Sequence, residues 1–193
     1  GESTTNEVTT LKKDLRDESG EVTTEMDSMV GWFKKFDYVS IDYYYRYRTI
    51  GQALNAMKLW EMELYPEGLY DALMYYHKKY KKPIVIAENG ISTDDNKPRK
   101  DGWTRGAAIV EHVKYMKKAM QEGVDVRGYF HWSITDSYEW GTFRPRFGLY
   151  NVDVLNDPEM KRKPTEAVQA YADVIKNNGV TPELTEMYKR PNR

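Results

Sequence analysis

Residues 83–90 read Pro-Ile-Val-Ile-Ala-Glu-Asn-Gly, a short apolar run that ends in a carboxylate, an amide and a glycine. Such β-branched residues favour a strand, and a run that is apolar on nearly every residue is typical of a strand with both faces buried. The run therefore predicts a strand over Pro83–Ala87. Glu88 follows it directly, so its carboxylate is expected at the edge of a buried region.

The segments on either side of this strand repeat an alternation of strand and helix. Strands are expected over Phe36–Tyr45, Pro83–Ala87 and Val124–Ser133, and helices over Pro66–Tyr80, Thr104–Glu122 and Pro164–Asn177. The third strand is as apolar as the second, which again predicts two buried faces. The alternation implies an α/β fold in which crossover helices join parallel strands.

Residues 1–193 are expected to form part of one domain, because no linker separates a second one. Residues 1–35 are polar and predict a loop or a short helix that leads into the first strand. Three strand-helix units cannot close a (β/α) barrel, which needs eight. An open sheet of three strands would have bare edges.

Composition excludes several classes of protein. The net charge of −1 gives no reason to expect nucleic acid or an anionic membrane as a partner. The chain has no Cys, and its three His residues are not at metal-ligand spacing, so neither thiolate chemistry nor a metal site is expected. No apolar run approaches a membrane span and no signal peptide is recognised, which favours a cytoplasmic location.

Polar and aromatic residues follow each predicted strand. They are Tyr43-Tyr44, Glu88-Asn89-Gly90 and the segment from Trp132 to Trp140. In a (β/α) barrel the carboxyl ends of the strands carry the active site. Considered alone, Glu88 could instead be a structural cap of a turn or helix. The segment from Trp132 to Trp140 could instead be a packed aromatic loop with solvated acids.

Three stretches together resemble glycoside hydrolase family 1. Pro83–Gly90 resembles the T-E-N-G motif of that family. Gly128–Trp140, followed by Arg146–Asp153, is similar to its G-Y-x-x-W-S-L-x-D-N-x-E-W…R-F-G-L-x-x-V-D block, and Ile41–Tyr44 looks like its N-Y-Y motif. The ending Asn177–Thr181 is similar to thermophilic archaeal members. The order and spacing agree from about residue 36 to the C-terminus.

The resemblance implies a retaining β-glycosidase, of the β-glucosidase or β-galactosidase kind, that needs no cofactor. Glu88 would be the nucleophile, and Tyr44 would donate a hydrogen bond that keeps the carboxylate ionised and oriented. The implied substrate is a terminal β-linked sugar. Trp132 would stack on the glycone ring, Glu139 and Trp140 would bind its hydroxyls, and Phe143 would help to wall the pocket.

The acid/base carboxylate of the family's N-E-P motif has no counterpart in this sequence. Asn6-Glu7-Val8 lacks the Pro and lies too close to Glu88 along the chain. The resemblance therefore implies the C-terminal portion, about three βα units, of a (β/α)8 TIM barrel that another polypeptide completes. That partner would be the N-terminal half with the acid/base; a higher oligomer is left open. The alternatives are a carbohydrate-binding protein without turnover and a truncated fragment.

The sequence departs from the family pattern at four places. Ala87 stands where the family has Thr, Met62 where relatives usually have Trp, and the loop from Trp140 to Arg146 is one residue short. Asp42 replaces an Asn, and a second carboxylate near Glu88 would raise its pKa. The aglycone, and the choice between glucosides and galactosides, are not decided by these residues.

Overall fold

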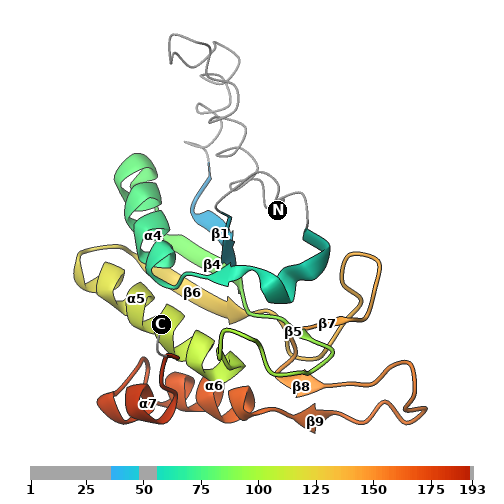
Figure 1. The fold of residues 1–193 in the computed structure, drawn as a ribbon. Coiled ribbons are helices and arrows are strands. Elements are labelled where there is room, and N and C mark those ends of the chain that lie inside the picture. The colour runs from blue at the N-terminus through green and yellow to red at the C-terminus, as the bar shows by residue number, and fades with distance from the viewer. Residues whose placement is uncertain (1–35, 48–55, 192–193) are drawn as a thin grey trace, which may run out of the picture.

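The computed structural model describes residues 36–47 and 56–191. The prediction for residues 1–35 lies outside these ranges. The centre of the fold is a parallel sheet of β1 (Val39–Tyr43), β4 (Ile84–Asn89) and β6 (Val126–His131), in the order β1-β4-β6 (Figure 1). Sequence order and spatial order agree, as expected for consecutive βα units.

The helices follow the strands as predicted, with small shifts at their ends. They are α4 (Glu67–Tyr80), α5 (Arg105–Gln121), α6 (Glu166–Lys176), the short α7 (Pro182–Met187) and the 3-10 helix η1 (Ala56–Glu61). Thr104 and Thr165 cap α5 and α6, because each hydroxyl accepts a backbone N–H of the first turn. The sequence reasoning missed α7 and η1.

Three two-residue ladders lie outside the parallel sheet, toward the carboxyl ends of its strands. They pair β2 (Tyr45–Arg46) with β3 (Glu63–Leu64), β5 (Thr93–Asp94) with β7 (Pro145–Arg146), and β8 (Tyr150–Asn151) with β9 (Lys163–Pro164). These ladders join the connecting loops to one another (Figure 1). The loops that follow the strands are therefore held by backbone hydrogen bonds as well as by side chains.

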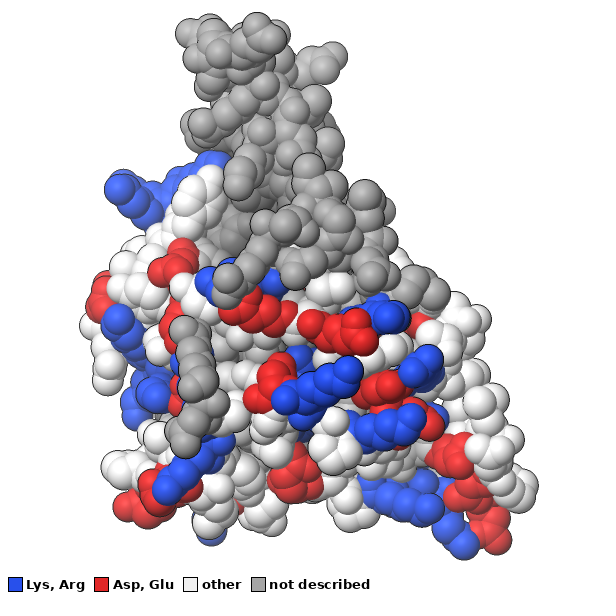
Figure 2. All heavy atoms as spheres, viewed as in Figure 1, with Lys and Arg blue, Asp and Glu red and all other residues white. Residues whose placement is uncertain are grey.

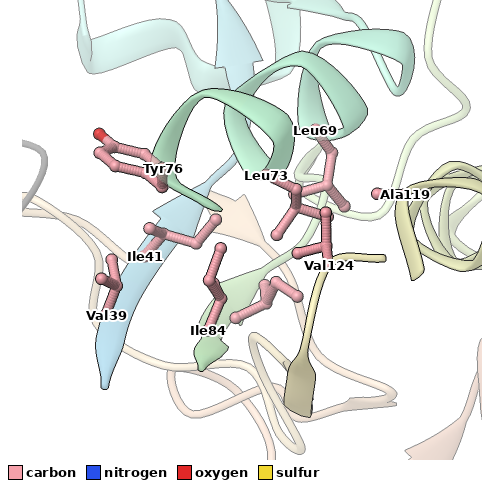
Figure 3. Packing of buried hydrophobic residues seen from close by; sticks show 9 residues of the cluster. Val39, Ile41, Leu69, Leu73, Tyr76, Ile84, Ala119 and Val124 are labelled. Atoms are coloured by element: carbon pink, nitrogen blue, oxygen red, sulfur yellow. The ribbon is translucent and has the colours of Figure 1, made fainter. Parts of the chain in front are cut away.

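One face of the sheet is buried against helices. Figure 3 shows β-strand and helix side chains in this layer, and the cluster comprises Val39, Ile41, Leu69, Leu73, Tyr76, Ile84, Ile86, Ala119 and Val124. The β-branched residues at alternate strand positions face Leu69 and Leu73 of α4, both fully buried. Successive side chains of a strand point to opposite faces, so apolar residues at alternate positions bury one face of the sheet.

Among the described residues the opposite face of the sheet is only partly buried, which differs from the prediction of two buried faces. Ser40, Val85 and Gly128 are paired across the three strands, and none of them is buried. Phe130, further along β6, is 58% exposed. No described element covers these side chains. The apolar sequence is nevertheless what a barrel strand requires, since the inner face of a barrel is filled by side chains from all its strands.

The described surface is mixed in charge. On the face seen in Figure 2, acidic and basic side chains are interspersed over the part of the chain that the structure describes. Among the described helices none is long and apolar enough to cross a membrane.

A buried amide ties the carboxyl ends of the three strands together. The Asn89 side chain, 1% exposed, donates from Nδ2 to the carbonyl of Tyr43 at 2.6 Å. Its Oδ1 accepts from the Tyr129 hydroxyl at 2.7 Å. Asn89 is the neighbour of Glu88, so this network holds the backbone on which the carboxylate depends.

We expect Tyr129→Phe to lower the free energy of unfolding by about 1–2 kcal/mol, because it leaves a buried amide oxygen without its donor. Urea unfolding of the protein measures the change. Tyr70→Phe is the matched control, since Tyr70 donates an exposed hydrogen bond to Glu122 and its loss should cost well under 1 kcal/mol. Equal effects of the two substitutions would contradict the bracing role of Asn89.

Candidate active site

A β-bulge in β4 determines where Glu88 points. Ile86 pairs with Ile41, but the next paired residues are Glu88 and Asp42, so Ala87 is an extra residue on β4. The same extra residue appears against β6, where Ile86 pairs with Tyr129 and Asn89 with His131. Without it, Glu88 would continue the alternation of Ile84 and Ile86 toward the helices. The bulge turns the carboxylate to the opposite side, as bulges next to functional sites often do.

Glu88 lies in a cavity at the carboxyl ends of the strands. The Tyr44 hydroxyl donates to Glu88 Oε2 at 2.7 Å. The cavity has a volume of about 470 Å³ and is lined by Tyr44, Tyr45, Tyr47, Leu59, Glu88, Trp132, Glu139, Trp140 and Phe147. Two carboxylates thus lie among aromatic side chains, the combination in which rings provide apolar faces and carboxylates accept hydrogen bonds from hydroxyl groups.

The electrostatics of the cavity act on Glu88 in opposite directions. Burial raises the pKa of its carboxyl, the hydrogen bond from Tyr44 lowers it, and the negative charges of Asp42 and Glu139 raise it again. The net direction is upward. Burial and the bond to Glu88 raise the pKa of Tyr44 well above its usual value, so Tyr44 stays protonated and acts as a donor.

The loop after β6 holds the second carboxylate in place. Glu139, 8% exposed, accepts at Oε1 from the Trp132 indole N–H at 3.0 Å and from the Ser137 hydroxyl at 2.6 Å. Trp132 and Glu139 are therefore joined as one unit at the cavity wall. Ser137 is a partner that the sequence reasoning did not single out, although it lies inside the quoted motif.

The same loop is anchored by a buried acid. Asp136, 6% exposed, accepts from the backbone N–H groups of Gly148 and Val152 at 2.9 and 3.1 Å. Arg146 approaches it at 3.7 Å and donates to the carbonyl of Val152 at 2.7 Å. Only glycine fits at Gly148, because a Cβ there would lie 2.4 Å from the carbonyl oxygen of Tyr150. This network sets the path of the chain beneath Glu139.

The structure brings five of the six predicted site residues to one cavity: Tyr44, Glu88, Trp132, Glu139 and Trp140. Phe143 is not among the lining residues. Its ring contacts that of Tyr138, with 5.0 Å between centroids, and its role as a wall residue stays a prediction. Phe147 lines the cavity instead.

Several lining residues were missed by the sequence reasoning. They are Tyr45, Tyr47, Leu59 and Phe147. Phe147 lies in the quoted R-F-G-L block, and Tyr45 follows directly on Tyr44, so their positions were a usable signal. Leu59 lies in η1, an element that was not expected, and no sequence signal connected it with Glu88. Among the described residues no group of His, Asp and Glu side chains could hold a metal ion.

Parallel βα units with acidic and aromatic side chains at the carboxyl ends of their strands are the arrangement found in a TIM barrel. The sequence profile of glycosyl hydrolase family 1 matches residues 33–180. This chain therefore belongs to glycosyl hydrolase family 1, and it corresponds to a partial piece of that family's barrel.

Individual relatives agree with this family. A β-galactosidase from Pyrococcus woesei is 41% identical over 125 residues, which cover 64% of this chain and 23% of that protein. A β-galactosidase from Sulfolobus acidocaldarius is 39% identical over 130 residues, or 67% of this chain and 25% of that protein. The chain thus spans about a quarter of the length of these curated relatives.

Solved structures show the same likeness. A β-glycosidase from Pyrococcus horikoshii matches with a TM-score of 0.63 and 30% identity, over 81% of this chain and 38% of that one. The β-glycosidase from Thermosphaera aggregans matches with a TM-score of 0.57 and 35% identity, over 66% of this chain and 25% of that one.

We expect Asp136→Asn to loosen the loop after β6. The substitution removes the charge opposite Arg146 and turns an amide N–H₂ toward one of two backbone donors, at a cost of about 1–3 kcal/mol. Hydrogen exchange at the amides of Gly148 and Val152 should speed up. The control is Asp157→Asn, because Asp157 accepts two backbone N–H groups in an exposed turn. Unchanged protection in Asp136→Asn would show that the acid does not anchor the loop.

Proposed function

We propose that this chain carries the nucleophile and the glycone site of a retaining β-glycosidase. The observation that carries the proposal is the Tyr44–Glu88 hydrogen bond inside a cavity of aromatic side chains that also holds Glu139. Membership of glycosyl hydrolase family 1 supports β-glycosidase activity in general.

In the proposed reaction Glu88 Oε1 attacks the anomeric carbon of a terminal β-linked sugar. The C–O bond to the leaving group breaks while the bond to Glu88 forms, and a carboxylic acid elsewhere protonates the departing oxygen. Water then hydrolyses the glycosyl ester, with that second group acting as base. Tyr44 bonds to the other carboxylate oxygen, Oε2, and so leaves Oε1 for attack.

The glycone would lie between the indoles and Glu139. Trp132 offers its ring face while its N–H is engaged by Glu139, so the orientation of the indole is set before a sugar arrives. Glu139 Oε1 is held by two donors, and we propose that Oε2 binds sugar hydroxyls. Trp140, 72% exposed, would close over the ring from the cavity mouth. We assign no sugar contact to Phe143.

Further strands must complete the barrel for this site to work. The inner face of the sheet, at Val85 and Phe130, has no described cover. The outer edge of β6 borders a groove of about 510 Å³ between α5 and α6, lined in part by Val126, Tyr129, Tyr171 and Val174. A parallel strand added to β6 would cover the groove, and the side chains of the remaining barrel strands would bury the inner face. We propose that a separate N-terminal polypeptide supplies it, together with the acid/base carboxylate about 5 Å from Glu88.

The first test concerns Glu88. A fluorinated glycoside that traps the glycosyl-enzyme should label the peptide containing Glu88, and Glu88→Gln should lower kcat by several orders of magnitude because the covalent route is lost. Mass spectrometry locates the label. Glu159→Gln is the control, since Glu159 is exposed and pairs with Lys161. Label on another residue would contradict the nucleophile assignment, and sugar binding without labelling would favour a carbohydrate-binding protein.

The second test concerns the completed barrel. Purification of the native protein should yield a second polypeptide whose contact with this chain buries more than about 2,000 Å², the size of an obligate interface. Val126→Glu should abolish that association, since it places a charge in the apolar groove beside β6. Lys163→Glu, in exposed β9, should not. A protein that is active and monomeric as residues 1–193 alone would contradict the proposed partner.

A further inference from the structure

A second acid lies beside the proposed nucleophile. Asp42 of β1 is the register partner of Glu88 of β4, so the two residues are side by side on neighbouring strands. They are brought into register by the extra residue Ala87. Paired residues on adjacent parallel strands point to the same face. The bulge that turns Glu88 toward the cavity therefore also places it against Asp42.

Three described side chains act on the charge of Glu88. Tyr44, just after β1, donates to it; Asp42 of β1 and Glu139 of the loop after β6 add negative charge. No Lys, Arg or His is among the described residues that line the cavity. The two acids therefore act on Glu88 without an opposing positive charge from this cavity wall.

Asp42 differs from Glu139 in its surroundings. Glu139 is a wall residue whose Oε1 is held by Trp132 and Ser137, and it belongs to the proposed sugar site. Asp42 is half-buried and is not among the residues that line the cavity. It is placed to act on Glu88 by its charge and not by contact with a sugar.

We propose that Asp42 is a positioning residue that sets the acid limit of the reaction, by making the neighbouring Glu88 take up a proton at a higher pH than it would beside a neutral side chain. The inference rests on the proposed role of Glu88 as nucleophile. The geometry that supports it is the Asp42–Glu88 register pair at the bulge.

The direction of the effect follows from charge. Glu88 attacks only as a carboxylate, so activity falls as the pH decreases through its pKa. A negative Asp42 disfavours the ionised form of Glu88 and moves that fall to higher pH. Removing the charge should move the acid limb of the pH profile to lower pH. Tyr44 opposes Asp42, because its hydrogen bond favours the carboxylate form.

The experiment compares wild type with Asp42→Asn, which keeps the shape and removes the charge. The profile of kcat/KM against pH is measured on the assembled enzyme with an aryl β-glycoside. We expect its acid midpoint to fall by roughly half a pH unit or more, as for loss of a like charge near a carboxyl. Asp125→Asn is the matched control: Asp125 precedes β6 and pairs with exposed Arg127. Its midpoint should not move.

A direct titration separates this proposal from the proposed function. The side-chain carboxyl carbon of Glu88, labelled with ¹³C and identified by its loss in Glu88→Gln, reports its own protonation whether or not the enzyme turns over. Its midpoint should fall in Asp42→Asn and also in Asp42→Ala, which serves if the first variant does not fold. An unchanged or raised midpoint overturns the role of Asp42. A lowered midpoint with label on another acid upholds the coupling but overturns Glu88 as nucleophile.

Discussion

The register of β4 against its two neighbours is the constraint on which the site depends. One extra residue, Ala87, changes the side of the sheet on which Glu88 lies. Ile84 and Ile86 before it face the helices, and the carboxylate of Glu88 after it faces the cavity. Asn89 then returns to the helix side and bonds to both neighbouring strands. The backbone is therefore held directly after the bulge, so the orientation of Glu88 does not depend on its side chain alone.

The loop after β6 is also held in a defined position, but by side-chain hydrogen bonds and not by strand register. The loop has little regular secondary structure, and hydrogen bonds of buried polar side chains hold it in place. Asp136 accepts hydrogen bonds from two backbone N–H groups and lies close to Arg146. Glu139 accepts hydrogen bonds from an indole N–H and a hydroxyl. Buried acids are costly unless they are fully bonded, which makes these networks specific for one path of the chain. In the proposed enzyme that rigidity would orient Trp132 before a sugar binds.

The described sheet has the features of part of a barrel. Its helix side is packed as in a barrel, while its inner side leaves Phe130 exposed. A barrel interior is filled in layers by side chains of all eight strands, so three strands cannot bury their own inner face. Membership of glycosyl hydrolase family 1 accounts for a sheet whose inner face is not fully buried by the described residues. The identity of the strands that complete it belongs to the proposal.

The sequence by itself determined the order of strands and helices, and it pointed to Glu88, Tyr44, Trp132, Glu139 and Trp140 as neighbours. Apolar periodicity is a local property, and the motifs follow strand ends, so both can be read along the chain. Only the tertiary structure decided the bulge at Ala87, the buried bonds of Asp136 and the place of Phe143. Register and burial depend on pairing between segments some forty residues apart, such as Asp42 with Glu88, and no local pattern records that pairing.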